Sequence, residues 1–182
     1  MLTVRTFIVG SIAFIVGLYA GDWLPDVDQD LSIVTHRSVF THGLIIPLVL
    51  FGLASSARAL LLRLFVIGFC LGAAVHLSYD LFPRAWQGFA LIHLPVFGWT
   101  FPAISWVWIA VSIVSCVYFT MRLVSGLFQG IAVLVGGVAM FSYTGLNEAT
   151  LAGPAASLAV ATIIGLAVVM WRSTAASDGS AL

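Results

Sequence analysis

The sequence has very little charge and no lysine. Only 8% of its 182 residues are charged, 62% are hydrophobic, and the mean hydropathy is +1.14. A soluble domain carries about 25% charged residues, because its surface must face water. The shortage of charge therefore excludes an ordinary soluble domain and predicts that most of the surface faces lipid.

Alternating hydrophobic stretches are missing as well. In lipid, backbone polar groups can be satisfied only within helices or closed barrels. The apolar runs are continuous over roughly 15 to 22 residues, which favours helices over barrel strands. Hydropathy predicts six spans, at residues 3–22, 42–57, 61–80, 102–121, 124–143 and 150–171. We therefore predict an all-α, polytopic membrane bundle that forms a single domain over residues 1–172, followed by a disordered polar tail at 173–182.

Several common functional signatures are also absent. The seven arginines are scattered singly, which excludes a nucleic-acid surface. Cys70 and Cys116 lie in separate apolar runs, so we expect small buried residues rather than a disulfide or a CxxC site. The sequence contains neither the HExxH pattern of zinc proteases nor the GxSxG pattern of serine hydrolases.

The charged residues separate by sign when the chain is followed through six crossings. One side of the bilayer receives five arginines: Arg5, Arg58, Arg63, Arg122 and Arg172. The other side receives Arg37 and Arg84, the acidic residues up to Glu148 and all four histidines. Positive charge near span ends marks the cytoplasmic side. Both termini are thus predicted to be cytoplasmic, and the acidic, histidine-rich face extracytoplasmic, in an inner or plasma membrane.

On that face, the end of the third span carries two potential metal ligands. His76 and Asp80 are four residues apart, which places them on one helix face about 6 Å apart along the axis. Gly68 and Gly72 continue the same stripe, and small residues at this spacing let another helix approach closely. We expect this face to point into the bundle.

The end of the first span supplies carboxylates. Asp26 and Asp28 follow Pro25, and side chains two residues apart in extended chain point the same way. Such a pair suits oxygen ligation of a divalent cation. Asp22 and Asp30 are expected to be bystanders.

The start of the second span supplies imidazoles. His36 and His42 bracket a short segment, and we expect both to bind metal opposite the other two segments. Arg37 lies between them and could hold an anionic oxygen, because a guanidinium group matches phosphate and carboxylate geometry. His93 lies on the same side and is a further candidate.

Carboxylate and imidazole ligands without thiolate predict zinc, with manganese or iron as alternatives. Six residues make up the predicted metal site: Asp26, Asp28, His36, His42, His76 and Asp80. A metal bound there would activate water as a nucleophile at neutral pH. Asp28 and Arg37 are the predicted catalytic residues, with Arg37 orienting an anionic group of the substrate.

These motifs resemble those of the YdjM-like family of inner-membrane, metal-dependent hydrolases. The family pattern is LPDxDH, then HRGxTHS, then a helix with SHxxxD. The chain has LPDVD at 24–28, HRSVFTH at 36–42 and HLSYD at 76–80. The resemblance covers residues 20–81 and implies that the same six residues are metal or catalytic residues.

Three positions depart from the family pattern. Gln29 stands where the pattern has histidine, Ser38 where it has glycine, and Gly43 where it has serine. The histidine that the family often has near the N-terminus is also missing here.

We expect a hydrolase in which metal-activated water attacks an ester or phosphoester of a lipid-like substrate at the outer membrane face. The interfacial site and the aromatic segment 82–101 favour a lipid-like substrate. A metal-binding membrane transporter or sensor remains an alternative, because intramembrane ionisable residues often mark ion pathways. A non-catalytic membrane protein is another. A phosphatidic-acid-phosphatase-like enzyme shares the HxxxD ending, but its PSGH motif and partner lysine are missing.

The lipid bilayer is the one partner that the composition requires, and no nucleic acid is expected. The sequence leaves the oligomeric state open. Gly126 and Gly130 could support helix association within or between chains.

Overall fold

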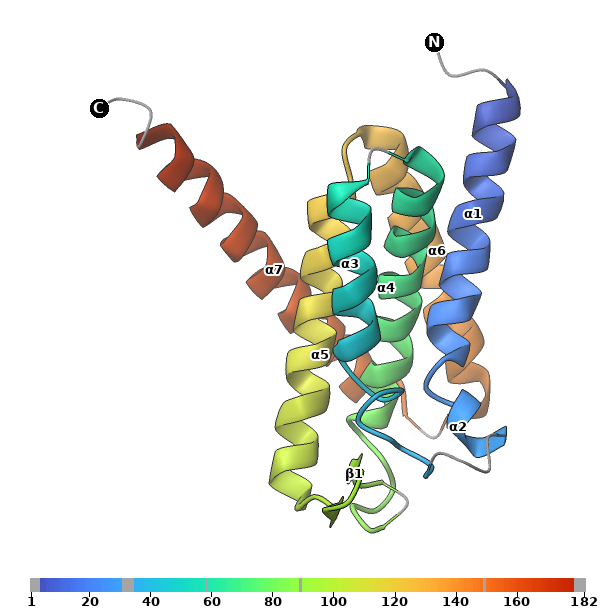
Figure 1. Cartoon of the computed structure of the whole chain (residues 1–182), viewed down its shortest axis with the longest axis vertical. Coiled ribbons are helices and arrows are strands. Elements are labelled where there is room, and N and C mark those ends of the chain that lie inside the picture. The colour runs from blue at the N-terminus through green and yellow to red at the C-terminus, as the bar shows by residue number, and fades with distance from the viewer. Residues whose placement is uncertain (1–3, 31–34, 58, 89, 149, 179–182) are drawn as a thin grey trace.

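The computed structural model describes residues 4–30, 35–57, 59–88, 90–148 and 150–178 (Figure 1). Its helices are α1 (Val4–Trp23), α2 (Val27–Asp30), α3 (Ile45–Ser56), α4 (Leu60–Asp80), α5 (Pro102–Leu123), α6 (Leu127–Thr144) and α7 (Ala152–Asp178). A 3-10 turn, Gly145–Asn147, follows α6, and the short strands β1 (His93–Leu94) and β2 (Gly98–Trp99) pair as an antiparallel hairpin. The prediction of an all-α fold is confirmed.

Six of the helices follow the six predicted spans. Five are long and apolar enough to cross a membrane. The exception is α3, which has 12 residues and is therefore about 18 Å long, short of the roughly 30 Å hydrocarbon core. The segment before it, residues 35–44, is not helical and contains buried polar side chains. Irregular backbone of this kind is tolerated in membrane proteins where protein surrounds it.

The last helix extends beyond its predicted span. Helix α7 continues to Asp178, so residues 173–178 of the tail expected to be disordered are helical. No glycine or proline lies between Arg172 and Gly179, which explains why the helix does not stop at Arg172. Residues 179–182 of the predicted tail lie outside the described residues.

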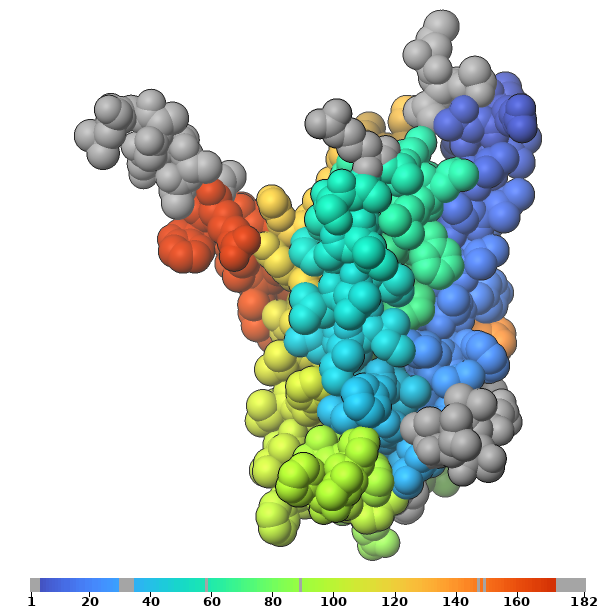
Figure 2. All heavy atoms as spheres, in the orientation of Figure 1, coloured from blue at the N-terminus to red at the C-terminus, as the bar shows by residue number. Residues whose placement is uncertain are grey.

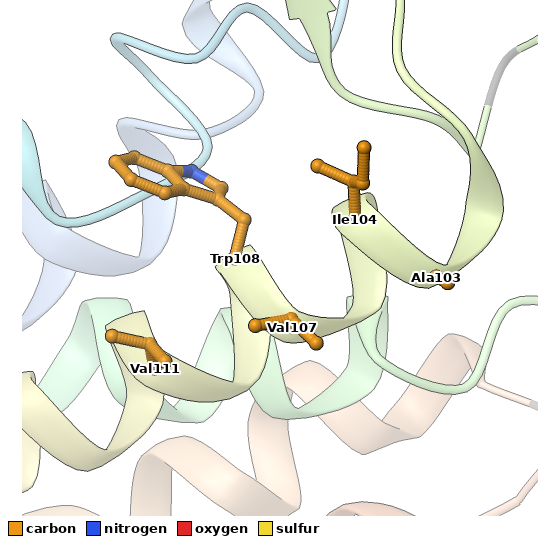
Figure 3. A pocket seen from close by; sticks show the side chains of 5 residues that line it. All are labelled: Ala103, Ile104, Val107, Trp108 and Val111. Carbon is orange, nitrogen blue, oxygen red and sulfur yellow. The ribbon is translucent and has the colours of Figure 1, made fainter.

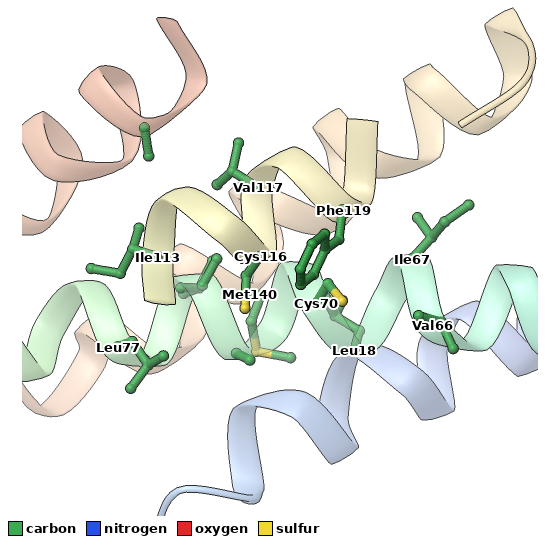
Figure 4. Close-up of a cluster of buried hydrophobic side chains, with 14 of the residues drawn as sticks. Leu18, Val66, Ile67, Cys70, Leu77, Ile113, Cys116, Val117, Phe119 and Met140 are labelled. Atoms are coloured by element: carbon green, nitrogen blue, oxygen red, sulfur yellow. The ribbon is translucent and has the colours of Figure 1, made fainter. Parts of the chain in front are cut away.

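The helices other than α2 alternate in direction, so both ends of the described chain lie at the top of the bundle in Figure 1. Helix α2 and the hairpin lie at the lower end (Figures 1 and 2). Helix α4 is central and packs against α1, α3, α5, α6 and α7. Cys70 and Cys116 are buried, free cysteines in the core between these helices, as predicted (Figure 4).

The closest helix contact is made by glycines of α1 and α4. At Gly17, Gly21, Gly68 and Gly72, an added Cβ would lie between 2.0 and 2.2 Å from a carbonyl oxygen of the facing helix. No real side chain fits such a space, so the backbones of α1 and α4 are in direct contact along the expected stripe. At Gly72 the neighbour includes the amide nitrogen of Asp22. This contact brings the end of α1 alongside the last turns of α4.

Candidate metal centre

The three predicted ligand segments meet at the lower end of the bundle. The ring centroids of His42 and His76 are 6.3 Å apart, and those of His36 and His42 are 5.5 Å apart. The carboxylates of the cluster come from the end of α4 and from the chain around α2. The structure thus gathers all six predicted residues: Asp26, Asp28, His36, His42, His76 and Asp80.

Asp80 ends α4, and its two oxygens have different surroundings. Oδ1 accepts a hydrogen bond of 2.7 Å from Arg37. Oδ2 lies 3.4 Å from Nε2 of His76 and 3.7 Å from Nε2 of His42. It is buried and has no hydrogen-bond partner among the described residues. Both distances exceed the range of about 2.7 to 3.2 Å typical of N–H···O hydrogen bonds.

Asp26 approaches the same point from the chain after α1. Its Oδ1 lies 3.9 Å from Nε2 of His76 and accepts a hydrogen bond from Gln29. Ligand atoms of Asp26, His42 and His76 lie within 4.8 Å of one another. The Asp26 side chain is 47% exposed, so it marks the open edge of the cluster.

The spacing of these atoms fits a divalent cation. Nitrogen and oxygen ligands lie about 2.0 to 2.2 Å from zinc, so neighbouring ligands of a tetrahedral ion stand about 3.3 Å apart. The distances around Oδ2 of Asp80, 3.4 and 3.7 Å, are close to that value. A buried acceptor without a donor costs about 1–3 kcal/mol, and a shared cation removes this cost. The donor set of imidazole and carboxylate suits zinc, manganese or iron.

Asp28 contacts the Nδ1 atoms of His36 and His42, and it is 2% exposed. Its Oδ1 is 2.9 Å from Nδ1 of His36, and its Oδ2 is 3.2 Å from Nδ1 of His42. The backbone N–H of Ser38 and the hydroxyl of Thr41 also donate to Oδ2. Burial alone would raise the pKa of Asp28, but the hydrogen bonds from His42, Thr41 and His36 outweigh it and hold the pKa well below its ordinary value.

The two carboxylates of the LPDVD motif therefore point apart, and the expectation of an extended DxD pair is wrong. Residue 28 lies in the single turn of α2, where side chains two positions apart do not share a face. Asp26 faces the open edge of the cluster, and Asp28 is enclosed by the 36–42 segment. A second potential ligand group, Asp28 with His36 and His42, also has ligand atoms within 4.8 Å of one another. In that group both Asp28 oxygens are already hydrogen-bonded by protein donors.

Asp22, expected to be a bystander, lies behind His76. Its Oδ1 is 3.8 Å from Nδ1 of His76 and accepts a hydrogen bond of 2.9 Å from Thr144 of α6. Asp22 and Asp28 are thus equivalent in position, each on the Nδ1 side of an imidazole whose Nε2 faces Asp80. Carboxylates in this position fix the ring orientation of metal-binding histidines. The sequence does contain a signal for this position of Asp22. Gly17 and Gly21, which let α4 approach α1 closely, lie directly before it.

Arg37, predicted to hold a substrate anion, contacts protein groups at both terminal nitrogens. It is buried and has a positive φ of 60°. One terminal nitrogen donates to Asp80 Oδ1, and the other lies 3.4 Å from the carbonyl oxygen of Ala90. These contacts hold the Asp80 carboxylate in one orientation, with Oδ2 directed at the histidines.

Helix α5 supports the segment that carries His42. The indole N–H of Trp108 donates to the carbonyl oxygen of His42 at 2.9 Å, and Figure 3 shows Trp108 reaching from α5 toward this segment. A Cβ added at Gly43 would lie 2.2 Å from Nε1 of Trp108. This contact explains why glycine stands where the family pattern has serine.

The β1–β2 hairpin supports the same segment through its backbone. The N–H of His93 donates to the carbonyl oxygen of Arg37 at 2.8 Å, and the N–H of Val39 donates to the carbonyl oxygen of His93 at 3.0 Å. The His93 ring packs edge-on against Trp99, with centroids 5.0 Å apart. His93, a further candidate ligand in the sequence, thus contributes its backbone to the site.

No family model, curated protein or solved structure matches this chain.

Proposed function

We propose that this protein is a membrane-bound, divalent-metal-dependent hydrolase that acts on an ester or phosphoester of a lipid-like substrate. The observation that carries the proposal is the buried Oδ2 of Asp80, which lies between the Nε2 atoms of two histidines without a hydrogen bond. The resemblance of the three motifs to the YdjM-like hydrolases supports the same activity.

His42, His76, Asp80 and Asp26 would hold the metal, with zinc expected first and manganese or iron as alternatives. When bound, a divalent ion of this kind supplies a Lewis acid that activates water and polarises a carbonyl or phosphoryl oxygen.

The remaining residues orient these ligands and move a proton. Asp28 and Asp22 fix the rings of His42 and His76, and Arg37 fixes Asp80. His36 is half-buried at the edge of the cluster, and Asp28 engages its Nδ1. We assign to Nε2 of His36 the role of accepting the proton that the attacking water releases, a task suited to imidazole at neutral pH.

The position of the cluster supports a lipid-like substrate. It lies at one end of a bundle whose long helices are apolar enough to span a membrane. The described arginines at the opposite end include Arg63, which donates to the carbonyl oxygen of Leu123, and Arg172, which lies over the Tyr118 ring. By the positive-inside rule, these arginines support a cytoplasmic location for that end and an extracytoplasmic location for the cluster.

Metal analysis of the purified, full-length protein tests the proposal. Wild type is expected to hold roughly one equivalent of zinc, manganese or iron, and the His76→Ala/Asp80→Ala double variant to hold none. His93→Ala is the matched control, because its ring packs on Trp99 outside the ligand set. Hydrolysis of carboxylic-ester and phosphoester lipid probes should stop on chelation and return with metal.

Absence of bound metal, or unchanged hydrolysis in the double variant, would overturn the proposal. Metal uptake into liposomes by the wild type, without hydrolysis, would favour the transporter alternative instead.

A further inference from the structure

The connection between α4 and α5 ends in a hairpin whose tip is apolar and almost completely exposed. Val96 is 99% exposed and Phe97 is 85% exposed, and Phe101 after the hairpin is 76% exposed. In Figure 2 the yellow-green atoms of this connection project below the blue and cyan atoms at the lower end of the molecule. Large apolar side chains this exposed at one point mark an interaction site.

The hairpin holds its tip in one strained shape. Val96 has a φ of 73°, and a β-branched residue in this region is a genuine outlier. Two residues later, Gly98 has a φ of 80°. The base of the hairpin is fixed by the strand pairing and by Thr100, whose N–H and hydroxyl both donate to the carbonyl oxygen of Ile92. Strain of this kind persists where the surrounding structure enforces it, and it often belongs to a function.

The hairpin leads into α5, which also has an exposed apolar face. Ile104, Val107 and Val111 are exposed on α5, and Figure 3 shows them along the same stretch of this helix. Residues 85–121, which include the hairpin and most of α5, contain no Asp, Glu, Lys or Arg. Helix α5 is one of the five helices long and apolar enough to span a membrane. The hairpin tip and the exposed face of α5 therefore belong to one uncharged stretch of the chain.

We propose that the β1–β2 hairpin is a membrane anchor whose tip, Val96 and Phe97, inserts into the lipid leaflet on the side of the metal centre. Trp99 follows the tip and is partly exposed, as expected for an aromatic side chain at the membrane interface. The partner is the bilayer itself, because residues 85–121 carry no charge that would select a protein and lead directly into a helix apolar enough to span a membrane.

The anchor is joined to the site by backbone hydrogen bonds. His93 of β1 makes two backbone hydrogen bonds with the segment 37–39: its N–H donates to the carbonyl oxygen of Arg37, and its carbonyl oxygen accepts from the N–H of Val39. Insertion of the tip therefore fixes the depth of the 36–42 segment relative to the lipid. This inference concerns lipid contact and does not depend on which reaction the metal centre performs.

Depth-dependent quenching tests the anchor in the full-length protein reconstituted in lipid nanodiscs. The buried cysteines are first replaced in a Cys70→Ala/Cys116→Ala background. An environment-sensitive fluorophore is then attached at Val96→Cys, or at Gln87→Cys as the control, an exposed polar position of the same connection. Nitroxide-labelled lipid should quench the label at 96 roughly twofold more strongly than at 87, and aqueous iodide should show the opposite order.

Equal iodide quenching at the two positions, without lipid quenching at 96, would overturn the anchor. A label at 96 shielded from both quenchers would overturn it in favour of a protein contact. Phe97→Cys provides a second reporter that leaves Val96 in place, and it should give the same result as Val96→Cys. Disagreement between the two reporters, with Phe97→Cys exposed to iodide, would count against insertion.

Discussion

Asp28 and Asp80 are two buried carboxylates of one cluster, but their surroundings differ. Asp28 receives hydrogen bonds at both oxygens from histidine, hydroxyl and backbone donors. Asp80 receives one from Arg37, and its other oxygen has no donor in the part of the chain that the structure describes. The protein itself therefore satisfies both oxygens of Asp28, whereas one oxygen of Asp80 is left for the cation that we propose binds there. Four predictions, taken from the largest expected effect to the smallest, test this difference.

His42 is the residue that both regions share, with Nδ1 toward Asp28 and Nε2 toward Asp80. His42→Ala should weaken zinc binding by more than about 100-fold, because loss of a ligand exceeds the 10- to 100-fold effect of losing its outer partner. Competition with a chromophoric chelator measures the affinity. His93→Ala should bind like wild type, and a His42→Ala protein that does the same would remove His42 from the ligand set.

Gly72→Val should push α1 away from α4 and so move the chain that carries Asp22, Asp26 and Asp28 away from Asp80. The new Cβ would lie 2.1 Å from the carbonyl oxygen of Leu18, so the helices must move apart. We expect a loss of about 3 kcal/mol in the free energy of unfolding, typical of strong overpacking, together with weaker metal binding. Gly130→Ala is the control, because nothing lies within 4 Å of its added Cβ. Unfolding in denaturing detergent that is equal for both variants would contradict this packing.

Asp28→Asn and Asp26→Asn make the same chemical change two residues apart. Asp28→Asn should lower the stability of metal-free protein by about 2 kcal/mol, because buried donors lose their acceptor. Asp26→Asn should change metal-free stability by less than about 0.5 kcal/mol, since its side chain is half exposed, and should reduce stabilisation by added zinc. The thermal unfolding temperature of each variant, measured once with chelator and once with zinc, distinguishes Asp28→Asn from Asp26→Asn. Equal effects in chelator would show that the regions do not differ as described.

Asp22→Asn should reduce zinc affinity roughly 10-fold, less than His42→Ala does, because the carboxylate lies on the Nδ1 side of His76, outside the ligand set. Thr144→Val should cause a smaller loss of zinc affinity, because it removes the hydroxyl that donates to Asp22. Thr144→Ser keeps this hydroxyl and should bind zinc like the wild type. The absorption spectrum of the cobalt-substituted protein reports the geometry of the ligands directly. An unchanged spectrum in both Asp22→Asn and Thr144→Val would exclude the coupling.

The parts of the structure that depend on helical periodicity could be predicted from the sequence. His76 and Asp80 share a face because they are four residues apart, and Gly68 and Gly72 mark the helix contact for the same reason. Helix positions followed from hydropathy because an uninterrupted apolar run leaves the backbone few alternatives in lipid.

The parts that depend on contacts between distant segments could not be predicted. Arg37 and Asp80 are paired across 43 residues, and Thr144 and Asp22 across 122 residues. Nothing in hydropathy specifies which polar side chains of neighbouring helices meet. The extended DxD pair was wrong for a related reason: the tight turn of α2 is stabilised by donors from the 36–42 segment, which local sequence does not reveal.

The hydrogen bonds from Trp108 and His93 to the 36–42 segment have a consequence for biosynthesis. All four proposed ligands emerge from the ribosome within the first 80 residues, together with Asp22, Asp28 and Arg37, but other groups that support them follow later, at His93, Trp108 and Thr144. A nascent chain that ends before α5 would carry every proposed ligand and still lack the hydrogen bonds from Trp108 to His42 and from Thr144 to Asp22. The second half of this protein, which contains none of the proposed ligands, thus completes the framework of the candidate metal centre.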